Sequence, residues 1–149
     1  QKLQDYLDQH EIQYVTISHS PAYTAQRIAE LTRIPGKELA KTVIVKIDDE
    51  LAMAVLPASR RVNLQHLQEA IGADEVTLSS EAEFNELFPD CEVGAMPPFG
   101  NLYNMGVYVA EQLTEDDEIA FNAGSHSELV KMSYKDFANL VTPQVVSLT

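Results

Sequence analysis

The sequence predicts a single α/β domain over residues 1–149, in which helices cover a mixed, curved β-sheet. Three observations support this fold class. Segments with helical and strand spacing of apolar residues alternate along the chain, which is typical of layered α/β proteins. Residues 41–56 have the pattern of a β-hairpin. A chain of 149 residues buries roughly 68–70% of its unfolded surface, which is enough for one substantial core.

Helices are expected where apolar residues recur every three to four positions beside a capping residue. Asn63 and Gly72 are residue types that begin and end a helix, and Ser80 with Glu83 has the spacing of a capping box. Thr24 and Ser133 are N-cap candidates for two further helices. The predicted helices span residues 2–9, 25–34, 64–71, 81–87 and 134–140.

Strands are expected where β-branched and apolar residues run together or alternate with polar ones. Residues 41–47 and 51–56 are two such runs, and Asp48-Asp49-Glu50 between them is a turn sequence. The remaining predicted strands span residues 14–19, 75–78, 106–110, 118–122 and 128–132. With helices between several of these strands, parallel and antiparallel pairs should coexist in the sheet.

The charge balance limits the classes of partner. The formal net charge of −13, from 23 acidic and 10 basic residues, argues against broad, non-specific contact with nucleic-acid backbones. The basic residues are unevenly distributed, since residues 62–130 contain neither Lys nor Arg. One locally positive face is expected if the fold gathers the others, and a scatter of solvated charges is the alternative. The basic residues that precede this stretch include Arg27, Arg33, Lys37, Lys41, Lys46, Arg60 and Arg61.

The sequence gives no sign of a membrane segment, a disulfide or a metal site. No apolar run approaches the ~20 residues that span a bilayer, and no secretory leader opens the chain. Cys91 is the only cysteine, which fits a reducing, cytoplasmic location. The four histidines have no zinc-site spacing, so neither a metal nor another cofactor is expected.

The stretch Gly94–Gly100 contains two glycines, two prolines and Phe99. Proline fixes φ and removes an N–H, while glycine allows unusual backbone angles and close approaches, so the stretch predicts a rigid turn. One interpretation is a tight surface turn. The functional interpretation is a stiff loop whose backbone N–H and C=O groups line a small pocket, with Phe99 as a wall.

Three side chains are candidates for chemistry. Lys41 opens an apolar strand, where its ammonium either reaches water or supplies a fixed positive charge to an oxyanion or a phosphate. His126 follows Gly124-Ser125 at a strand end, where loops often hold functional side chains, although a hydrogen-bonded turn histidine is equally consistent. Cys91 with His126 as base would form a thiol nucleophile, but a lone cysteine is more often an apolar filler.

Three segments, taken in order, resemble the YbaK/ProX family, whose members are free-standing relatives of the editing domain of bacterial prolyl-tRNA synthetases. The resemblance spans nearly the whole chain and includes its ending at residues 130–137. It implies the YbaK/ProRS-associated domain fold and metal-independent hydrolysis of the ester that joins a mischarged amino acid to tRNA. The three segments are Leu-Ala-Lys-Thr-Val-Ile-Val (39–45), Gly-Ala-Met-Pro-Pro-Phe-Gly (94–100) and Phe-Asn-Ala-Gly-Ser-His (121–126).

The resemblance also implies a set of site residues. Catalytic roles fall on Lys41, Gly94, Gly100 and His126. Apart from the resemblance, the clustering of basic residues leads us to expect phosphate contacts with tRNA from Arg27, Arg33 and Lys37. Substrate-binding roles fall on Thr42, Met96, Pro97, Pro98, Phe99, Gly124 and Ser125. Some branches of the family have Asn where this chain has Thr42.

The expected mechanism needs no strong nucleophile, because an aminoacyl ester is already activated. The Gly94–Gly100 loop would hold the acyl group and polarise its carbonyl, Lys41 would supply positive charge, and His126 would orient substrate or water. The expected partners are the acceptor end of aminoacyl-tRNA, an aminoacyl-tRNA synthetase, and a fused or separate signalling domain, with no membrane. The alternatives are a non-catalytic sensory module that binds an aminoacyl group or amino acid, and a metal- or thiol-dependent hydrolase.

Overall fold

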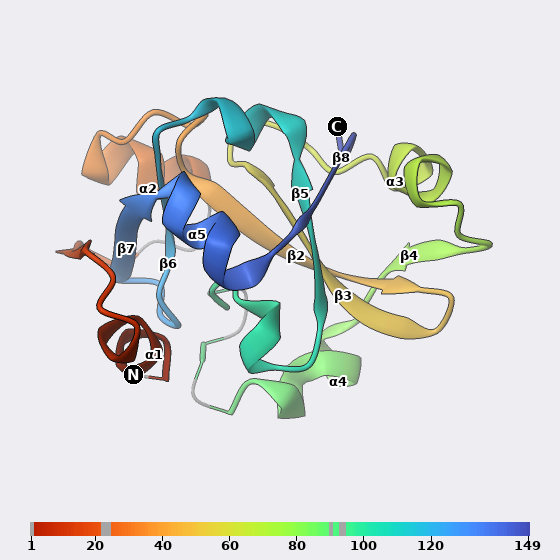
Figure 1. Cartoon of the computed structure of the whole chain (residues 1–149), viewed down its shortest axis with the longest axis horizontal. Helices are drawn as coiled ribbons and strands as arrows, with labels where there is room; N and C mark the ends of the chain where they lie inside the picture. Colours follow the sequence, from red (N-terminus) through yellow and green to blue (C-terminus); the bar gives the residue numbers. More distant parts are fainter. Residues whose placement is uncertain (1, 22–24, 90, 93–94) are drawn as a thin grey trace.

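The computed structural model describes residues 2–21, 25–89, 91–92 and 95–149 (Figure 1). It confirms the mixed α/β fold class. Within the described residues the strands are β1 (Tyr14–Ser18), β2 (Ala40–Ile47), β3 (Glu50–Pro57), β4 (Val76–Leu78), β5 (Gly106–Ala110), β6 (Glu118–Asn122), β7 (Glu128–Ser133) and β8 (Gln144–Val146). The α-helices are α1 (Lys2–Gln9), α2 (Ala25–Thr32), α3 (Leu64–Ile71), α4 (Glu81–Phe84) and α5 (Tyr134–Val141). Short 3-10 helices are η1 (Asn85–Leu87), η2 (Gly100–Leu102) and η3 (Glu111–Glu115).

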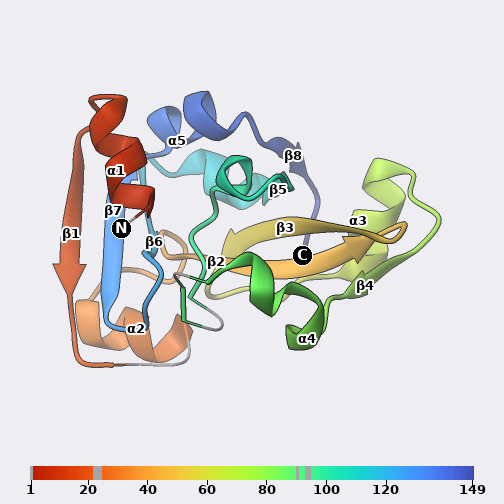
Figure 2. The same ribbon diagram turned by 90° about the horizontal axis from the view of Figure 1, so that it is seen from below.

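The strands divide between two sheets, which Figures 1 and 2 show side by side. The larger sheet has the order β4-β2-β3-β5-β8, with β3–β5 and β5–β8 parallel and the other pairs antiparallel. The smaller sheet, β1-β7-β6, is antiparallel throughout. A bridge between Leu39 and Ala120 connects the entry to β2 with β6, so the start of β2 lies where the two sheets meet.

The hairpin formed by β2 and β3 follows from its turn residues. Asp48 and Asp49 have φ angles of 47° and 71°, the left-handed pair of angles that a two-residue hairpin turn requires. The Asp48 carboxylate also accepts hydrogen bonds from the backbone N–H groups of Asp74 and Glu75, beside β4. The turn is thereby attached to the strand that pairs with the other side of β2.

Capping residues set several helix ends as predicted. The Asn63 side chain accepts a 3.0 Å hydrogen bond from the His66 backbone N–H at the start of α3, and Gly72, with φ 69°, ends it. Ser133 accepts a hydrogen bond from the Asp136 backbone N–H in the same way at α5. The predicted cap Thr24 lies outside the described residues.

Two sequence predictions about elements need correction, and three elements were not predicted. The second helix ends at Thr32 rather than 34, because Arg33 takes a left-handed φ of 59°. The predicted helix 81–87 is one turn of α-helix followed by a 3-10 turn. Strand β8 was not predicted, nor were η2 and η3. No described helix has the length and apolar character needed to cross a membrane.

The core forms on both faces of the larger sheet. On one face, Ile44 of β2 belongs to the main cluster with the rings of Phe99, Phe121 and Phe137, whose centroids lie 5.4–6.4 Å apart. On the other face, alternate residues of β2 and β3 pack against α3. A third cluster beneath α2 includes Leu39, the residue before β2. The start of β2 therefore has packed core on both sides.

One ion pair makes the stability of this fold depend on pH. The Lys46 ammonium pairs with the Glu83 carboxylate, which also accepts 3.0 Å hydrogen bonds from the backbone N–H and the hydroxyl of Ser80. These partners, Lys46 first, lower the pKa of Glu83 from 4.5 to about 2. Because the folded pKa is depressed, this stabilisation is present above pH 4.5 and is lost as the pH falls toward 2.

We therefore expect Glu83→Gln to lower the melting temperature at pH 7 and to lower it much less near pH 2, where the carboxyl is protonated in the unfolded state and about half protonated in the folded state. Glutamine keeps an acceptor oxygen for Ser80, so the variant isolates the charge. Thermal melts across this pH range measure the difference. The control is Glu86→Gln, which neutralises an exposed carboxylate three positions further on. An equal shift in both variants would contradict the assignment to Lys46.

Candidate functional site

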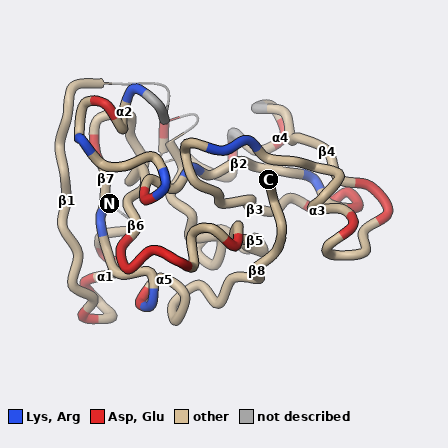
Figure 3. Tube along the Cα trace, turned by 90° about the horizontal axis from the view of Figure 1, so that it is seen from above, with Lys and Arg blue, Asp and Glu red and all other residues tan. Residues whose placement is uncertain are grey.

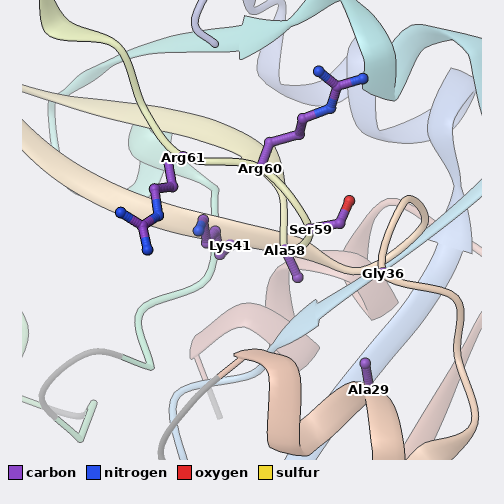
Figure 4. Close-up of a pocket in the computed structure, with 7 residues that line it drawn as sticks. All are labelled: Ala29, Gly36, Lys41, Ala58, Ser59, Arg60 and Arg61. Carbon is purple, nitrogen blue, oxygen red and sulfur yellow. The ribbon is translucent and has the colours of Figure 1, made fainter.

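A cavity of about 440 Å³ opens at the start of β2. Its lining comes from α2, from the connection between α2 and β2, from β2 itself and from the segment after β3 (Figure 4). The lining residues are Ala29, Gly36, Lys41, Ala58, Ser59, Arg60 and Arg61. We call this the Lys41 cavity.

Strand alternation places Lys41 in the cavity. Lys41 is opposite Leu56 in the β2–β3 register and shares a sheet face with Leu39, which packs beneath α2. Thr42 follows it and therefore lies on the opposite face, with Ile44 and the main core. The predicted neighbours Lys41 and Thr42 consequently face different surroundings.

The electrostatics of the Lys41 cavity are positive. Lys41, Arg60 and Arg61 line it, and no described carboxylate does. Burial, followed by the charge of Arg61, lowers the pKa of Lys41 below its ordinary value. Figure 4 shows the Lys41 and Arg61 side chains close together, with Arg60 pointing away from both. A site of this kind attracts an anion, such as a phosphate or a developing oxyanion.

The tube in Figure 3 shows where the remaining charges lie. Basic segments follow one another along α2, the α2–β2 connection, the start of β2 and the segment after β3. Acidic segments concentrate at the β2–β3 hairpin and in the stretch between η3 and β6. Most basic residues therefore lie on neighbouring segments, with acidic residues between some of them (Figure 3).

The three residues expected to bind tRNA differ in their surroundings. Arg27 forms a 3.2 Å ion pair with Glu30, one turn further along α2, and both side chains are exposed. Arg33 is exposed at the end of α2. Lys37 lines a smaller hollow that also contains Arg60. Their role in binding stays a prediction.

The described part of the Gly–Pro loop is core rather than a surface turn. Gly94 lies outside the described residues, but residues 95–100 are all buried, and Phe99 is 0% exposed. Phe99 contacts Phe121 and Phe137 at ring-centroid distances of 5.6 Å and 5.4 Å. Among the described residues of this loop, none lines the Lys41 cavity.

Three hydrogen bonds join Glu92, before the loop, and Ala95, within it, to the predicted Gly-Ser-His turn. The Glu92 backbone N–H donates to the Gly124 carbonyl at 2.7 Å, and the Gly124 N–H donates to the Ala95 carbonyl at 2.9 Å. The Glu92 carboxylate accepts a 2.7 Å hydrogen bond from the backbone N–H of His126. Gly124 has φ 96°, a conformation that favours glycine, and His126 is buried. The segments 94–100 and 121–126, two of the three that carry the family resemblance, are therefore adjacent.

The third segment meets them through the core. Ala40, immediately before Lys41, belongs to the same apolar cluster as Met96 and Ala123. The structure thus brings the backbones of all three segments to one region of the fold. The predicted substrate-binding residue Ser125 shares the turn with His126, and its hydroxyl lies 3.4 Å from that of Ser127.

The other sequence candidates have ordinary structural surroundings. The Cys91 sulfur lies 3.6 Å from the Tyr103 hydroxyl and packs, partly buried, at the edge of the main core. Within the described residues, no three His, Cys, Asp or Glu side chains are grouped so that they could hold a metal ion. The sequence identified Arg60 and Arg61 only as basic residues and gave no sign of Ser59 or Glu92. Tertiary contacts place these residues at the site, and none of them belongs to a local motif.

Comparisons with known proteins match this chain over most of its length. The family model of the aminoacyl-tRNA editing domain matches residues 19–140. A multifunctional Ser/Thr-tRNA deacylase, ProXp-y of Escherichia coli, is 28% identical over 99% of this chain and 90% of its own. A proline–tRNA ligase of Halalkalibacterium halodurans is 32% identical over 52% of this chain, which corresponds to 13% of the ligase.

Solved structures share the fold. A candidate trans-editing enzyme for prolyl-tRNA synthetase superposes with a TM-score of 0.84 at 19% identity, covering 99% of this chain and 94% of its own. A hypothetical protein superposes with a TM-score of 0.88 at 21% identity over 99% of both chains. On the match to the family model, this chain belongs to the aminoacyl-tRNA editing domain family.

Proposed function

We propose that this protein is a trans-editing aminoacyl-tRNA deacylase, which hydrolyses the ester between a mischarged amino acid and the 3′-terminal ribose of tRNA. The observation that carries the proposal is the Lys41 cavity, a positive hollow whose lysine belongs to the first of the three editing-type segments. The residue before it, Ala40, packs in the main core with the other two segments. The substrate has phosphates close to a reactive ester, and the cavity offers the Lys41 and Arg61 cations beside the uncharged residues of its lining (Figure 4).

The proposed chemistry uses water and no metal. Water adds to the ester carbonyl, the carbonyl oxygen becomes an oxyanion, and the C–O bond to ribose breaks to give a free amino acid and a ribose hydroxyl. Lys41 supplies positive charge beside the oxyanion or the terminal phosphate. Backbone groups of the 94–100 loop hold the acyl group, and His126 orients the substrate or the water. The neighbouring ribose hydroxyl assists by accepting or relaying the proton of the attacking water.

The identity of the acyl group is suggested by the relatives. The Escherichia coli relative is named for deacylation of Ser- and Thr-tRNA, so seryl and threonyl esters are the first substrates to test. The proline–tRNA ligase match adds tRNA acylated by a prolyl-tRNA synthetase to the panel. Hydroxyl-bearing and small acyl groups would then share one site.

The decisive experiment is a deacylation assay on a panel of aminoacyl-tRNAs, with amino-acid release measured against the spontaneous rate. We expect multiple turnovers on a mischarged subset and none on correctly charged tRNA. Stoichiometric binding of an aminoacyl group without turnover would favour the sensory module instead. Unchanged rates after chelator treatment and in Cys91→Ser are expected, because neither a metal nor the thiol takes part in the proposed reaction.

The lowered pKa of Lys41 predicts a pH limit to catalysis. If the ammonium form acts, activity falls as the pH rises through the pKa of Lys41, after subtraction of spontaneous hydrolysis. Removal of the neighbouring charge in Arg61→Ala should raise that pKa, because Arg61 contributes to lowering it. We therefore expect the alkaline limb of the kcat profile to move to higher pH in this variant. An unmoved limb would assign it to another group.

A further inference from the structure

A second hollow, of about 250 Å³, adjoins the Lys41 cavity. The two share Ser59 and Arg60, so the segment after β3 forms a wall between them. Figure 4 shows Arg60 turned away from Lys41, as its place in both linings requires. The second hollow is lined by Lys37, Pro57, Ser59, Arg60, Gln112, Glu115 and Asp116.

The polar groups of the second hollow are both donors and unsatisfied acceptors. Lys37 and Arg60 supply N–H donors. The side-chain oxygens Gln112 Oε1 and Asp116 Oδ2 are buried and have no hydrogen-bond partner in the described part of the chain. An unpartnered buried acceptor destabilises the protein, so a ligand that brings N–H donors to these oxygens is favoured.

The charge of the second hollow also differs from that of the Lys41 cavity. Two cations and two carboxylates line the second hollow, so their charges balance. In the Lys41 cavity, all charged side chains among the described lining residues are cations. Burial, followed by the charge of Glu38, raises the pKa of Asp116. A balanced set of donors and acceptors suits a neutral polar group better than a second phosphate.

We infer that the second hollow is a subsite for the cytidine that precedes the terminal adenosine of tRNA. This inference rests on the proposed function, which places the terminal ribose at the Lys41 cavity. Cytosine carries an exocyclic amine beside a ring nitrogen and a carbonyl oxygen, so it offers donors on one side and acceptors on the other. The amine faces Gln112 and Asp116, and Arg60 donates to the base carbonyl from the shared wall.

The first test changes the substrate and leaves the protein intact. Minihelices acylated with the same amino acid are prepared with CCA, with uridine for the second cytidine, and with uridine for the first. Uridine replaces the exocyclic amine by a carbonyl, which faces the two acceptor oxygens. We expect kcat/KM to fall about 5- to 100-fold for the second-cytidine substitution and much less for the first. Equal kcat/KM for all three would overturn the inference.

The second test uses the protein. Asp116→Asn replaces an acceptor oxygen with an amide and is expected to reduce the preference for cytidine over uridine. The control is Asp117→Asn, which neutralises an exposed neighbour outside the second hollow. Aminoacyl-adenosine, which has no cytidine, is the substrate control, and Asp116→Asn should lose a smaller fraction of the wild-type rate on it than on the CCA minihelix. A cytidine preference unchanged in Asp116→Asn would overturn the assignment of this residue.

Absence of deacylase activity can be distinguished from absence of the cytidine subsite. A wild-type protein that hydrolyses neither minihelices nor aminoacyl-adenosine has no deacylase activity, whatever the subsite binds. Binding of uncharged minihelices then tests the subsite by itself. Tighter binding of CCA than of the second-position uridine variant would support the subsite, and equal affinity would exclude it.

Discussion

Replacement of Lys41 by alanine is expected to lower kcat/KM for deacylation by about 10²- to 10³-fold, the usual cost of removing one preorganised oxyanion-stabilising group. The reason is its position. Lys41 is the residue of β2 that lines the positive cavity. Its lowered pKa reflects partial burial beside Arg61. Steady-state deacylation of a mischarged substrate measures the effect. The melting temperature should change little, because the side chain packs no core.

Two variants separate charge from general perturbation. Lys41→Arg keeps a cation at the site and should retain more activity than Lys41→Ala. Lys46→Ala removes a lysine from the opposite face of the same strand, where it pairs with Glu83, and should leave deacylation near the wild-type rate. If folded Lys41→Ala turned over as fast as the wild type, Lys41 would have no part in the reaction.

Local sequence patterns predicted much of the fold because its elements have local signals. The hairpin turn at Asp48-Asp49 and the caps Asn63 and Ser133 act over a few residues, and their strands and helices form as expected. Strand β8 has no such signal. It is three residues long and pairs parallel with β5, more than 30 positions away, so only tertiary structure defines it.

The candidate site was predictable in part for the same reason. Lys41 was recognisable as a charged residue in an apolar strand, and Gly124 as a turn glycine. The wall of the Lys41 cavity at Ser59 and Arg60 had no motif, because it follows β3 and reaches the cavity through strand pairing. The Gly94–Gly100 loop was expected to line a pocket with Phe99 as a wall, yet the Phe99 ring packs in the core.

Gly100 leaves no room for a side chain. A Cβ atom there would lie 2.5 Å from the Met105 carbonyl oxygen and 2.7 Å from a methyl carbon of Val107. The first obstacle is backbone, and it cannot rotate away as a side chain can. The Gly100 carbonyl also accepts 2.9 Å hydrogen bonds from the N–H groups of Tyr103 and Met105, which hold this approach in place.

We therefore expect Gly100→Ala to destabilise the protein by about 1–3 kcal/mol, as overpacking of a close contact does. For a chain of this size each kcal/mol lowers the melting temperature by roughly 2–4 °C, so thermal or denaturant unfolding resolves the change. Gly106→Ala is the matched control. A Cβ at Gly106 meets only a ring carbon of Tyr108, at an ordinary 3.9 Å, so this variant should melt close to the wild type.

The activity of Gly100→Ala, measured well below its melting temperature, bears on the loop's proposed role. Relief of the contact with Met105 shifts the backbone at Gly100 or at Met105. Because Pro97 and Pro98 stiffen the preceding loop, we expect a shift at Gly100 to reach Ala95, whose carbonyl accepts the hydrogen bond from the N–H of Gly124. If these segments hold the acyl group, kcat/KM falls in the folded variant, while Gly106→Ala keeps the wild-type value. A destabilised Gly100→Ala with full activity would limit Gly100 to a structural role.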